Sequence, residues 1–176
     1  MAQENSFPSF DNFKKYYNKK ISQLVLRKIS NDLETPLSAF LKIAIDKKNS
    51  FLYESVQDGE TKGRYSIIGL NPDKILEIKN KNTKIYFEDS LLREYKDDPI
   101  KRIRTFIKDS TLIIPKNVPT ICSGVFGYLG YEFVNNIEKL PSASNDEMGL
   151  PDGILLRPSI VIIFDSITKE ISICLH

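Results

Sequence analysis

The scarcity of imidazole and thiol groups limits the chemistry that this sequence can support. His176 is the single histidine, and Cys122 and Cys174 are the two cysteines. Serine and cysteine nucleophiles and most protein metal sites use an imidazole near neutral pH, and zinc sites need closely spaced cysteines and histidines. The sequence therefore argues against these chemistries within the chain. The two cysteines are predicted to be reduced, partly buried thiols.

Acidic residues are plentiful, but their surroundings do not mark a catalytic pair. Glu88-Asp89 and Asp97-Asp98 are adjacent pairs in polar, turn-like stretches. Water screens such charges, so we predict solvated loops at both places rather than a general acid and base.

One carboxylate, Glu54, lies in the apolar run Phe51-Leu52-Tyr53-Glu54-Ser55. The period of two in a strand puts Glu54 on the same face as Leu52, so its carboxylate is predicted to be partly buried and to need a donor. Two interpretations stay open. Glu54 pairs with Arg64 and pins a hairpin, or Glu54 and Ser55 hold the polar part of a ligand in a small amphipathic pocket.

Glycine recurs at every third position within residues 121–132, at Gly124, Gly127 and Gly130. This spacing matches neither the dinucleotide-binding fingerprint nor the P-loop. We predict a structural role, in which the missing side chains let neighbouring backbone or aromatic rings such as Phe126 approach closely.

The composition is that of an ordinary globular protein, with 176 residues, 41% hydrophobic and 27% charged. The net charge of +2 is too small to predict nucleic-acid binding, and we interpret the cations around Lys101 and Arg104 as a solvated helix face. The longest apolar run, residues 160–164, is too short to span a membrane, and the first residues lack the pattern of a signal peptide. A cytoplasmic protein with neither nucleic acid nor membrane as partner is predicted.

Helical and strand periods follow one another along the chain. A helix is predicted at about residues 9–18, because Ser9 is a capping-type start and apolar residues follow it at helical spacing. Helices are also predicted from Thr35-Pro36 to about Lys47 and from Asp98-Pro99 onward, because Thr or Asp before proline is a strong helix start. Strands are predicted at residues 21–30, 51–56, 65–70, 75–78, 84–87, 154–165 and 170–175. Sequential strands pair antiparallel, so we predict an α+β fold of mainly antiparallel sheet packed with a few helices. No repeat or low-complexity tract divides residues 1–176, and we expect a single region that is part of a longer chain.

Several segments resemble the N-terminal region of anthranilate synthase component I. The run 51–55 and the stretch Gly63-Arg64-Tyr65-Ser66 resemble the Leu-Leu-Glu-Ser and Arg-Tyr-Ser-x-x-Gly signatures of that family. Residues 123–132 resemble its Gly-Gly-x-x-Gly-Tyr-x-x-Tyr-Asp segment, and residues 150–152 and 162–165 are also similar to it. The similarity runs in the right order over essentially the whole chain. Tyr53, Ser123 and Glu132 depart from the signatures.

The resemblance implies the N-terminal part of the anthranilate and aminodeoxychorismate synthase fold. Residues 1–176 would be a regulatory and structural region of a lyase, and the catalytic C-terminal half would be absent. That half would bind chorismate and Mg²⁺, whereas this fragment would hold no cofactor and would be inactive alone. The whole protein would make anthranilate for tryptophan biosynthesis, with ammonia from a glutamine amidotransferase subunit, component II.

The resemblance also implies a feedback-inhibition site for L-tryptophan in this region. Glu54 and Ser55 would contact the amino-acid head of the inhibitor, and Arg64, Tyr65 and Ser66 would line the same site. Because residues of the missing half complete the site in this family, the fragment is expected to bind weakly by itself.

Two alternatives to this function stay open. Para-aminobenzoate (aminodeoxychorismate) synthase component I shares the fold and much of the Glu-Ser signature. A stand-alone amino-acid-binding module or a non-catalytic interaction domain is the alternative hypothesis from a different functional class.

Overall fold

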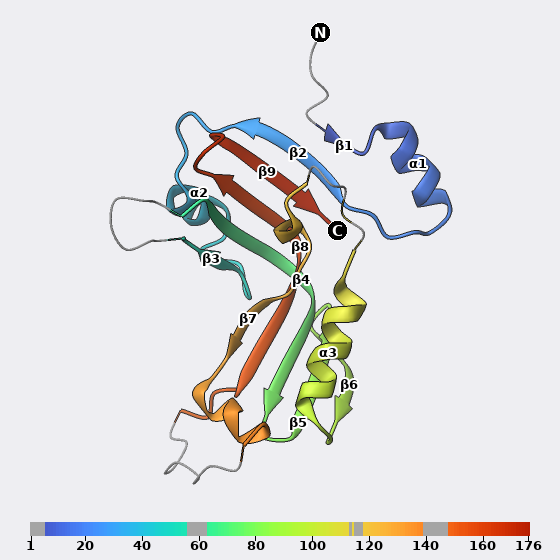
Figure 1. Cartoon of the computed structure of the whole chain (residues 1–176), viewed down its shortest axis with the longest axis vertical. Helices are drawn as coiled ribbons and strands as arrows, with labels where there is room; N and C mark the ends of the chain where they lie inside the picture. The colour runs from blue at the N-terminus through green and yellow to red at the C-terminus, as the bar shows by residue number, and fades with distance from the viewer. Residues whose placement is uncertain (1–5, 56–62, 113, 115–117, 139–147) are drawn as a thin grey trace. The chain divides into compact units, whose positions relative to one another are not determined.

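The computed structural model describes residues 6–55, 63–112, 114, 118–138 and 148–176 (Figure 1). The strands are β1 (Ser6–Phe7), β2 (Val25–Ser30), β3 (Phe51–Tyr53), β4 (Tyr65–Lys79), β5 (Asn82–Phe87), β6 (Ser90–Tyr95), β7 (Phe126–Leu129), β8 (Gly153–Asp165) and β9 (Glu170–Leu175). The helices are α1 (Phe10–Asn18), α2 (Pro36–Ile43), α3 (Pro99–Ser110) and the short 3₁₀ helices η1 (Thr120–Cys122) and η2 (Tyr131–Asn136). Within these ranges, no helix is both long enough and apolar enough to cross a membrane.

The strands pair antiparallel, as their order along the chain predicts. Hydrogen bonds link them in the order β1-β2-β9-β8-β4-β5-β6, with β3 added to β4 and β7 added to β8. Each pair of strands with a described register is antiparallel. The predicted α+β class, mainly antiparallel sheet with a few helices, is confirmed.

Contacts along the chain divide it into two compact units, each with its own core. The first unit comprises Met1–Asn71, Leu112–Ser123 and Ser159–His176, and the second comprises Pro72–Thr111 and Gly124–Pro158. The long strands β4 and β8 contribute residues to both units. The predicted site residues all belong to the first unit.

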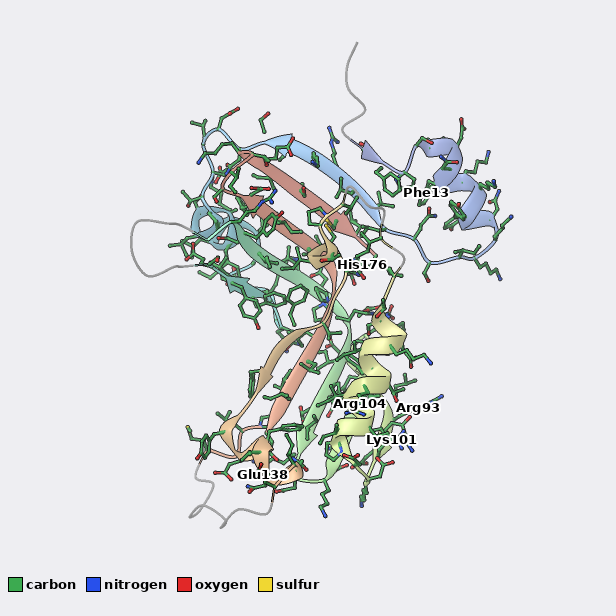
Figure 2. All side chains as sticks on the ribbon, in the orientation of Figure 1. Phe13, Arg93, Lys101, Arg104, Glu138 and His176 are labelled. Carbon is green, nitrogen blue, oxygen red and sulfur yellow. The ribbon has the colours of Figure 1, made fainter. Side chains whose placement is uncertain are left out.

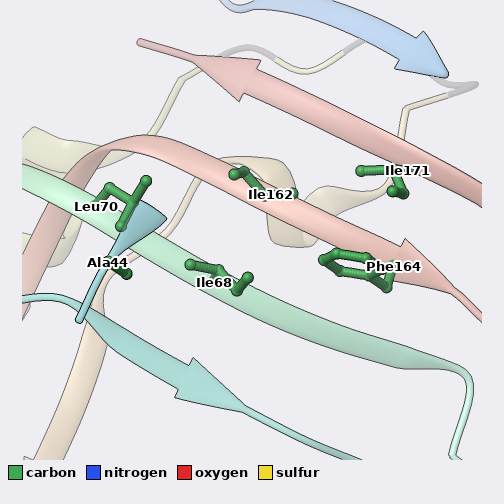
Figure 3. Packing of buried hydrophobic residues seen from close by; sticks show 6 residues of the cluster. All are labelled: Ala44, Ile68, Leu70, Ile162, Phe164 and Ile171. Carbon is green, nitrogen blue, oxygen red and sulfur yellow. The ribbon is translucent and has the colours of Figure 1, made fainter. Parts of the chain in front are cut away.

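Strand β8 is buried on both faces within the first unit, as the unbroken apolar run predicts. Ile162 and Phe164 pack on one face in a cluster beneath α2. Val161 and Ile163 are buried on the opposite face. Figure 3 shows the cluster on the first face, which consists of Ala44, Ile68, Leu70, Ile162, Phe164 and Ile171.

Helix α2 begins where the sequence predicts and ends earlier. The Thr35 hydroxyl accepts a hydrogen bond from the Ser38 amide at 3.1 Å, and the Ser38 hydroxyl accepts one from the Thr35 amide at 2.9 Å. The predicted end near Lys47 is wrong, because the Ser50 hydroxyl donates to the Ala44 carbonyl at 3.0 Å and folds the chain back into a turn.

The second unit has a separate core beneath α3. Leu76, Ile78, Phe106 and Phe133 are buried there. The Asp98 carboxylate caps α3 by accepting a hydrogen bond from the Ile100 amide at 2.9 Å, as the Asp-Pro start predicts. The buried face of α3 thus packs on the strands, and its basic residues, among them Lys101 and Arg104 in Figure 2, extend from the helix.

Two features of the second unit differ from the prediction. Strand β4 continues through Asn71-Pro72, where a break is predicted. The partner of β4 changes there from β3 to β5, and a proline, which has no N–H to donate, is tolerated at such an exchange. Strand β6 is not predicted, because its charged residues obscure the alternation. Glu88 and Asp89 form the turn before β6 with positive φ angles of 45° and 63°.

Gly127 confirms the predicted structural role of the glycine segment. It lies in β7 opposite Leu155 of β8. A Cβ atom at this position would lie 1.8 Å from the Ile154 carbonyl oxygen, which is backbone and cannot rotate away. The absence of a side chain at Gly127 is therefore a condition for the pairing of β7 with β8.

Replacing Gly127 with alanine is expected to lower the free energy of unfolding by about 1–3 kcal/mol, because β7 must move away from β8 to accept a methyl group. Chemical denaturation monitored by circular dichroism measures this change. Gly124→Ala is the matched control, because its new methyl group would meet only the Phe126 ring at 3.8 Å. Equal stability of the two variants would refute the close approach.

Candidate functional site

The structure brings the five predicted site residues together from two neighbouring segments of the first unit. They are Glu54 and Ser55, directly after β3, and Arg64, Tyr65 and Ser66, at the start of β4. Strands β3 and β4 pair antiparallel with Tyr53 opposite Ile67, so the two segments run side by side. A Cβ atom at Gly63 would lie 1.7 Å from the Ser55 hydroxyl oxygen, which shows how closely they approach.

Glu54 is exposed, and the partial burial predicted for its carboxylate is wrong for this chain. Strand β3 ends at Tyr53, so the alternation that would turn Glu54 toward the apolar face of Leu52 stops one residue too early. The ion pair with Arg64 that the sequence left open is not formed, because Arg64 binds Asp165 instead.

Arg64 is held by a carboxylate 101 positions away in the sequence. Its Nε and Nη2 atoms donate to one oxygen of Asp165 at 3.1 and 2.9 Å. The guanidinium carbon lies 4.7 Å from the centroid of the Tyr65 ring, within the range of a cation–π interaction. Arginine is cationic at neutral pH in any surroundings, and the hydrogen bond to Asp165 raises the pKa of Arg64 further above its ordinary value.

Asp165 ends β8 and organises the turn into β9. Its other carboxylate oxygen accepts hydrogen bonds from the backbone amides of Ile167 at 2.9 Å and Thr168 at 3.2 Å. Burial raises the pKa of the Asp165 carboxyl, but the hydrogen bonds from Arg64 and the two amides outweigh it and leave the pKa below its ordinary value. A charged Asp165 therefore fixes Arg64 at neutral pH.

Asp165 was not among the site residues predicted from the sequence. The available signal is an aspartate at the end of a buried strand followed by Ser166 and Thr168, a pattern typical of a side chain that caps a turn. The Ser166 amide also donates to the Arg64 carbonyl at 2.9 Å, so the turn holds the start of β4 through the backbone as well.

A pocket of about 250 Å³ lies beside this ion pair in the first unit. Arg64 and Tyr65 line it, whereas Glu54, Ser55 and Ser66 do not. Its other lining residues are Lys28, Val118, Pro119, Ile163, Asp165, Thr168, Glu170 and Ser172. Sequence reasoning found two of the lining residues, because the others come from segments that only the fold brings together.

Charges of both signs line the pocket, and they are paired. Lys28 Nζ lies 2.9 Å from a carboxylate oxygen of Glu170, and Arg64 pairs with Asp165 at the same distance. Paired cations and anions beside an aromatic ring suit the binding of a zwitterion better than acid–base chemistry. Among the described residues, no three His, Cys, Asp or Glu side chains are grouped so that they could hold a metal ion.

The fold and the pocket define a class of protein: an antiparallel α+β region whose candidate site has paired charges that suit ligand binding better than acid–base catalysis. No family model matches the chain. The chain is 34% identical over 169 residues to anthranilate synthase component 1 of Cereibacter sphaeroides, aligning 94% of this chain with 34% of that protein. It is 38% identical over 144 residues to anthranilate synthase component 1 of Pseudomonas aeruginosa, aligning 80% of this chain with 29% of that protein.

A crystal structure of anthranilate synthase component I from Streptococcus pneumoniae TIGR4 aligns with 81% of this chain and 30% of its own, at 19% identity and a TM-score of 0.48. The identity to these sequence relatives shows that the chain is homologous to a part of anthranilate synthase component I, which confirms the resemblance seen in the sequence. It spans about a third of the length of the curated relatives that it matches.

The variant Asp165→Asn is expected to be less stable than the wild type at neutral pH and equally stable in acid. Because folding lowers the pKa of Asp165, the carboxylate stabilises the fold above its ordinary pKa of 3.8, and this contribution is lost as the pH falls through the folded value. The free energy of unfolding, measured by denaturant titration from neutral to acidic pH, tests the convergence.

Asp46→Asn is the matched control, because Asp46 is exposed in the turn that follows α2. Its stability should follow the wild type at every pH. A constant difference between Asp165→Asn and the wild type down to the lowest pH would contradict the role of the charge.

Proposed function

We propose that this chain is the regulatory region of an anthranilate synthase component I and carries part of an L-tryptophan feedback-inhibition site. The whole protein would convert chorismate and ammonia to anthranilate in tryptophan biosynthesis. Its catalytic half, with bound Mg²⁺, would lie outside these residues, and a glutamine amidotransferase subunit would supply the ammonia. The naming of the relatives supports the activity, and coverage of about a third of their length supports a region rather than a whole enzyme.

The observation that carries this proposal is the juxtaposition of Glu54 and Ser55 with the charged start of β4. An amino acid presents a carboxylate and an ammonium group. The guanidinium of Arg64 has five N–H donors, and the bonds to Asp165 leave others for a ligand carboxylate. The exposed carboxylate of Glu54 and the hydroxyl of Ser55 are suitable acceptors for the ammonium group.

The size of the pocket supports a site that is only partly built by this chain. Small-molecule pockets commonly enclose roughly 300–1,000 Å³, and the pocket beside Arg64 encloses about 250 Å³. It would take only the group of the ligand that binds Arg64, because Glu54 and Ser55 lie outside its lining, and the indole ring would need further walls. The rest of the protein would supply them, so the 176-residue chain would bind weakly.

Inhibition through this site would be allosteric. L-tryptophan would favour a less active arrangement of the regulatory and catalytic halves and of the interface with the amidotransferase. A ligand shifts such an equilibrium only as far as its affinities for the two arrangements differ. The residues that contact its head group are therefore expected to control inhibition and to leave uninhibited turnover near normal.

Calorimetric titration of L-tryptophan into the protein with its catalytic half present is the direct test. Stereospecific binding, absent with D-tryptophan, would support the proposal. The same titration of the 176-residue chain would measure how much of the site it contains. No binding to an active, folded protein would overturn the feedback site.

The variants Ser55→Ala and Glu54→Ala are expected to raise the L-tryptophan concentration for half-maximal inhibition about tenfold to a hundredfold. Each would remove a hydrogen bond to a charged head group, which contributes about 1.5–3 kcal/mol. Inhibition curves of anthranilate formation from chorismate measure the shift.

Ser90→Ala is the control for the serine substitution, because Ser90 is an exposed residue of the second unit. It should change neither turnover nor inhibition. A large loss of turnover in Ser55→Ala with inhibition intact would contradict the assignment.

Identification of the product of the chorismate reaction separates the two branches, since an aminodeoxychorismate product would replace the proposal with the para-aminobenzoate alternative.

A further inference from the structure

A second pocket, of about 500 Å³, lies at the end of the β4–β5 hairpin in the second unit. Among the described residues that line it, the charged ones are one carboxylate, Glu77, and four lysines, and the others are two asparagines. The lysines are Lys79, Lys81, Lys84 and Lys96. This lysine pocket therefore has an excess of positive charge.

The register of the strands explains why these lysines gather. Lys84 of β5 lies opposite Glu77 of β4, and directly opposed side chains share one face of a sheet. The alternate residues of β4, Leu76 and Ile78, are buried in the core beneath α3, so the charged row lies on the other face. Lys96 directly follows β6, which pairs with β5, and reaches the pocket from there.

The turn of the hairpin is fixed from behind. Asn80 has a positive φ of 55°, and its amide donates to a carboxylate oxygen of Asp152 at 2.5 Å. Lys79 Nζ donates to the Leu150 carbonyl at 2.5 Å and lies 3.9 Å from the other carboxylate oxygen of Asp152. Lys79 is thus already engaged, and the turn that carries Lys81 is in place before any ligand binds.

The other three lysines of the pocket lack a carboxylate partner. Within the part of the chain that the structure describes, Lys81, Lys84 and Lys96 form no ion pair. Glu77 and Glu94 lie opposite Lys84 on the two neighbouring strands, and the Glu94 carboxylate instead accepts a hydrogen bond from an asparagine side chain at 2.6 Å. Lys84 is partly buried, and cations that gather in one place repel each other. An anion in the pocket would relieve both costs.

We propose that the lysine pocket binds a small molecule that carries a phosphate or pyrophosphate group. A lysine ammonium group is a compact charge with three donors, and a phosphate group carries close to two negative charges near neutral pH. Three ammonium groups therefore match a phosphate or pyrophosphate better than a single carboxylate. Small-molecule pockets commonly enclose roughly 300–1,000 Å³. At about 500 Å³, this one has room for more than the phosphate itself.

Calorimetric titration with inorganic pyrophosphate tests whether such an anion binds. The full-length protein is used, without divalent cations that would form complexes with pyrophosphate. We expect saturable binding that weakens as the NaCl concentration rises. Succinate, a dicarboxylate, should bind more weakly. The proposal would be overturned by a lack of saturable pyrophosphate binding, or by binding of succinate or of a hexaglutamate peptide that is at least as tight.

Neutralising the unpaired lysines shows whether the anion binds at this pocket. The pocket variant combines Lys81→Gln, Lys84→Gln and Lys96→Gln. It is expected to raise the dissociation constant of pyrophosphate about tenfold to a hundredfold, because each change removes a charge-assisted contact. An unchanged dissociation constant in a folded variant would place the binding elsewhere and overturn the proposal.

A matched control removes the same charge from the exposed face of α3 in the same unit. Two of its three positions, Lys101 and Arg104, are labelled in Figure 2. The control combines Lys101→Gln, Arg104→Gln and Lys108→Gln. Its affinity for pyrophosphate should equal that of the wild type. An equal loss of affinity in the control and in the pocket variant would show that only the net charge attracts the anion, and would overturn the site.

Footprinting of the wild-type protein decides the location even if the pocket variant fails to fold. Lysines are acetylated under limiting reagent with and without pyrophosphate, and mass spectrometry of the peptides measures the modification at each position. Pyrophosphate is expected to protect Lys81, Lys84 and Lys96 and to leave Lys101 and Lys108 unchanged. Protection confined to lysines outside the pocket, or protection of none, would overturn the proposal.

Discussion

The burial of β8 on both faces is the constraint on which the first unit depends. A strand covered on both sides needs apolar side chains at successive positions, and residues 161–164 supply them. One face of β8 packs in the cluster beneath α2, and on the other face Val161 lies directly opposite Cys174 of β9. Because β8 lies between β9 and β4 in the hydrogen-bond order, its end brings Asp165 within reach of Arg64.

Paired charges account for a polar pocket that is formed before any ligand binds. An unpaired charge in a partly buried site is costly, and both cations of the pocket have carboxylate partners, Lys28 with Glu170 and Arg64 with Asp165. The guanidinium is thereby oriented, while half of the Arg64 side chain remains exposed. A ligand that needs a fixed cation would find one without first reordering the side chain, which reduces the cost of binding.

Local signals in the sequence predicted the elements well, and pairing between distant segments explains the failures. Thr35 and Asp98 cap their helices as predicted, because a cap depends only on residues a few positions away. The continuity of β4 through Asn71-Pro72 was not predictable from its own residues, because it depends on the exchange of one partner strand for another. At the site, the closeness of Ser55 to Gly63 followed from the predicted hairpin, but the partner of Arg64 did not.

The class of fold, the helix starts, the doubly covered strand and the family follow from the sequence, because each of these is encoded in short-range periods, caps and signatures. The exposure of Glu54, the pairing of Arg64 with Asp165, and the contact of His176 with the Cys122 carbonyl follow only from the tertiary structure. Arg64 and Asp165 are 101 positions apart. Contacts of this kind arise from the register of antiparallel strands and from the path of a connecting segment, and neither is encoded in the residues that make the contact.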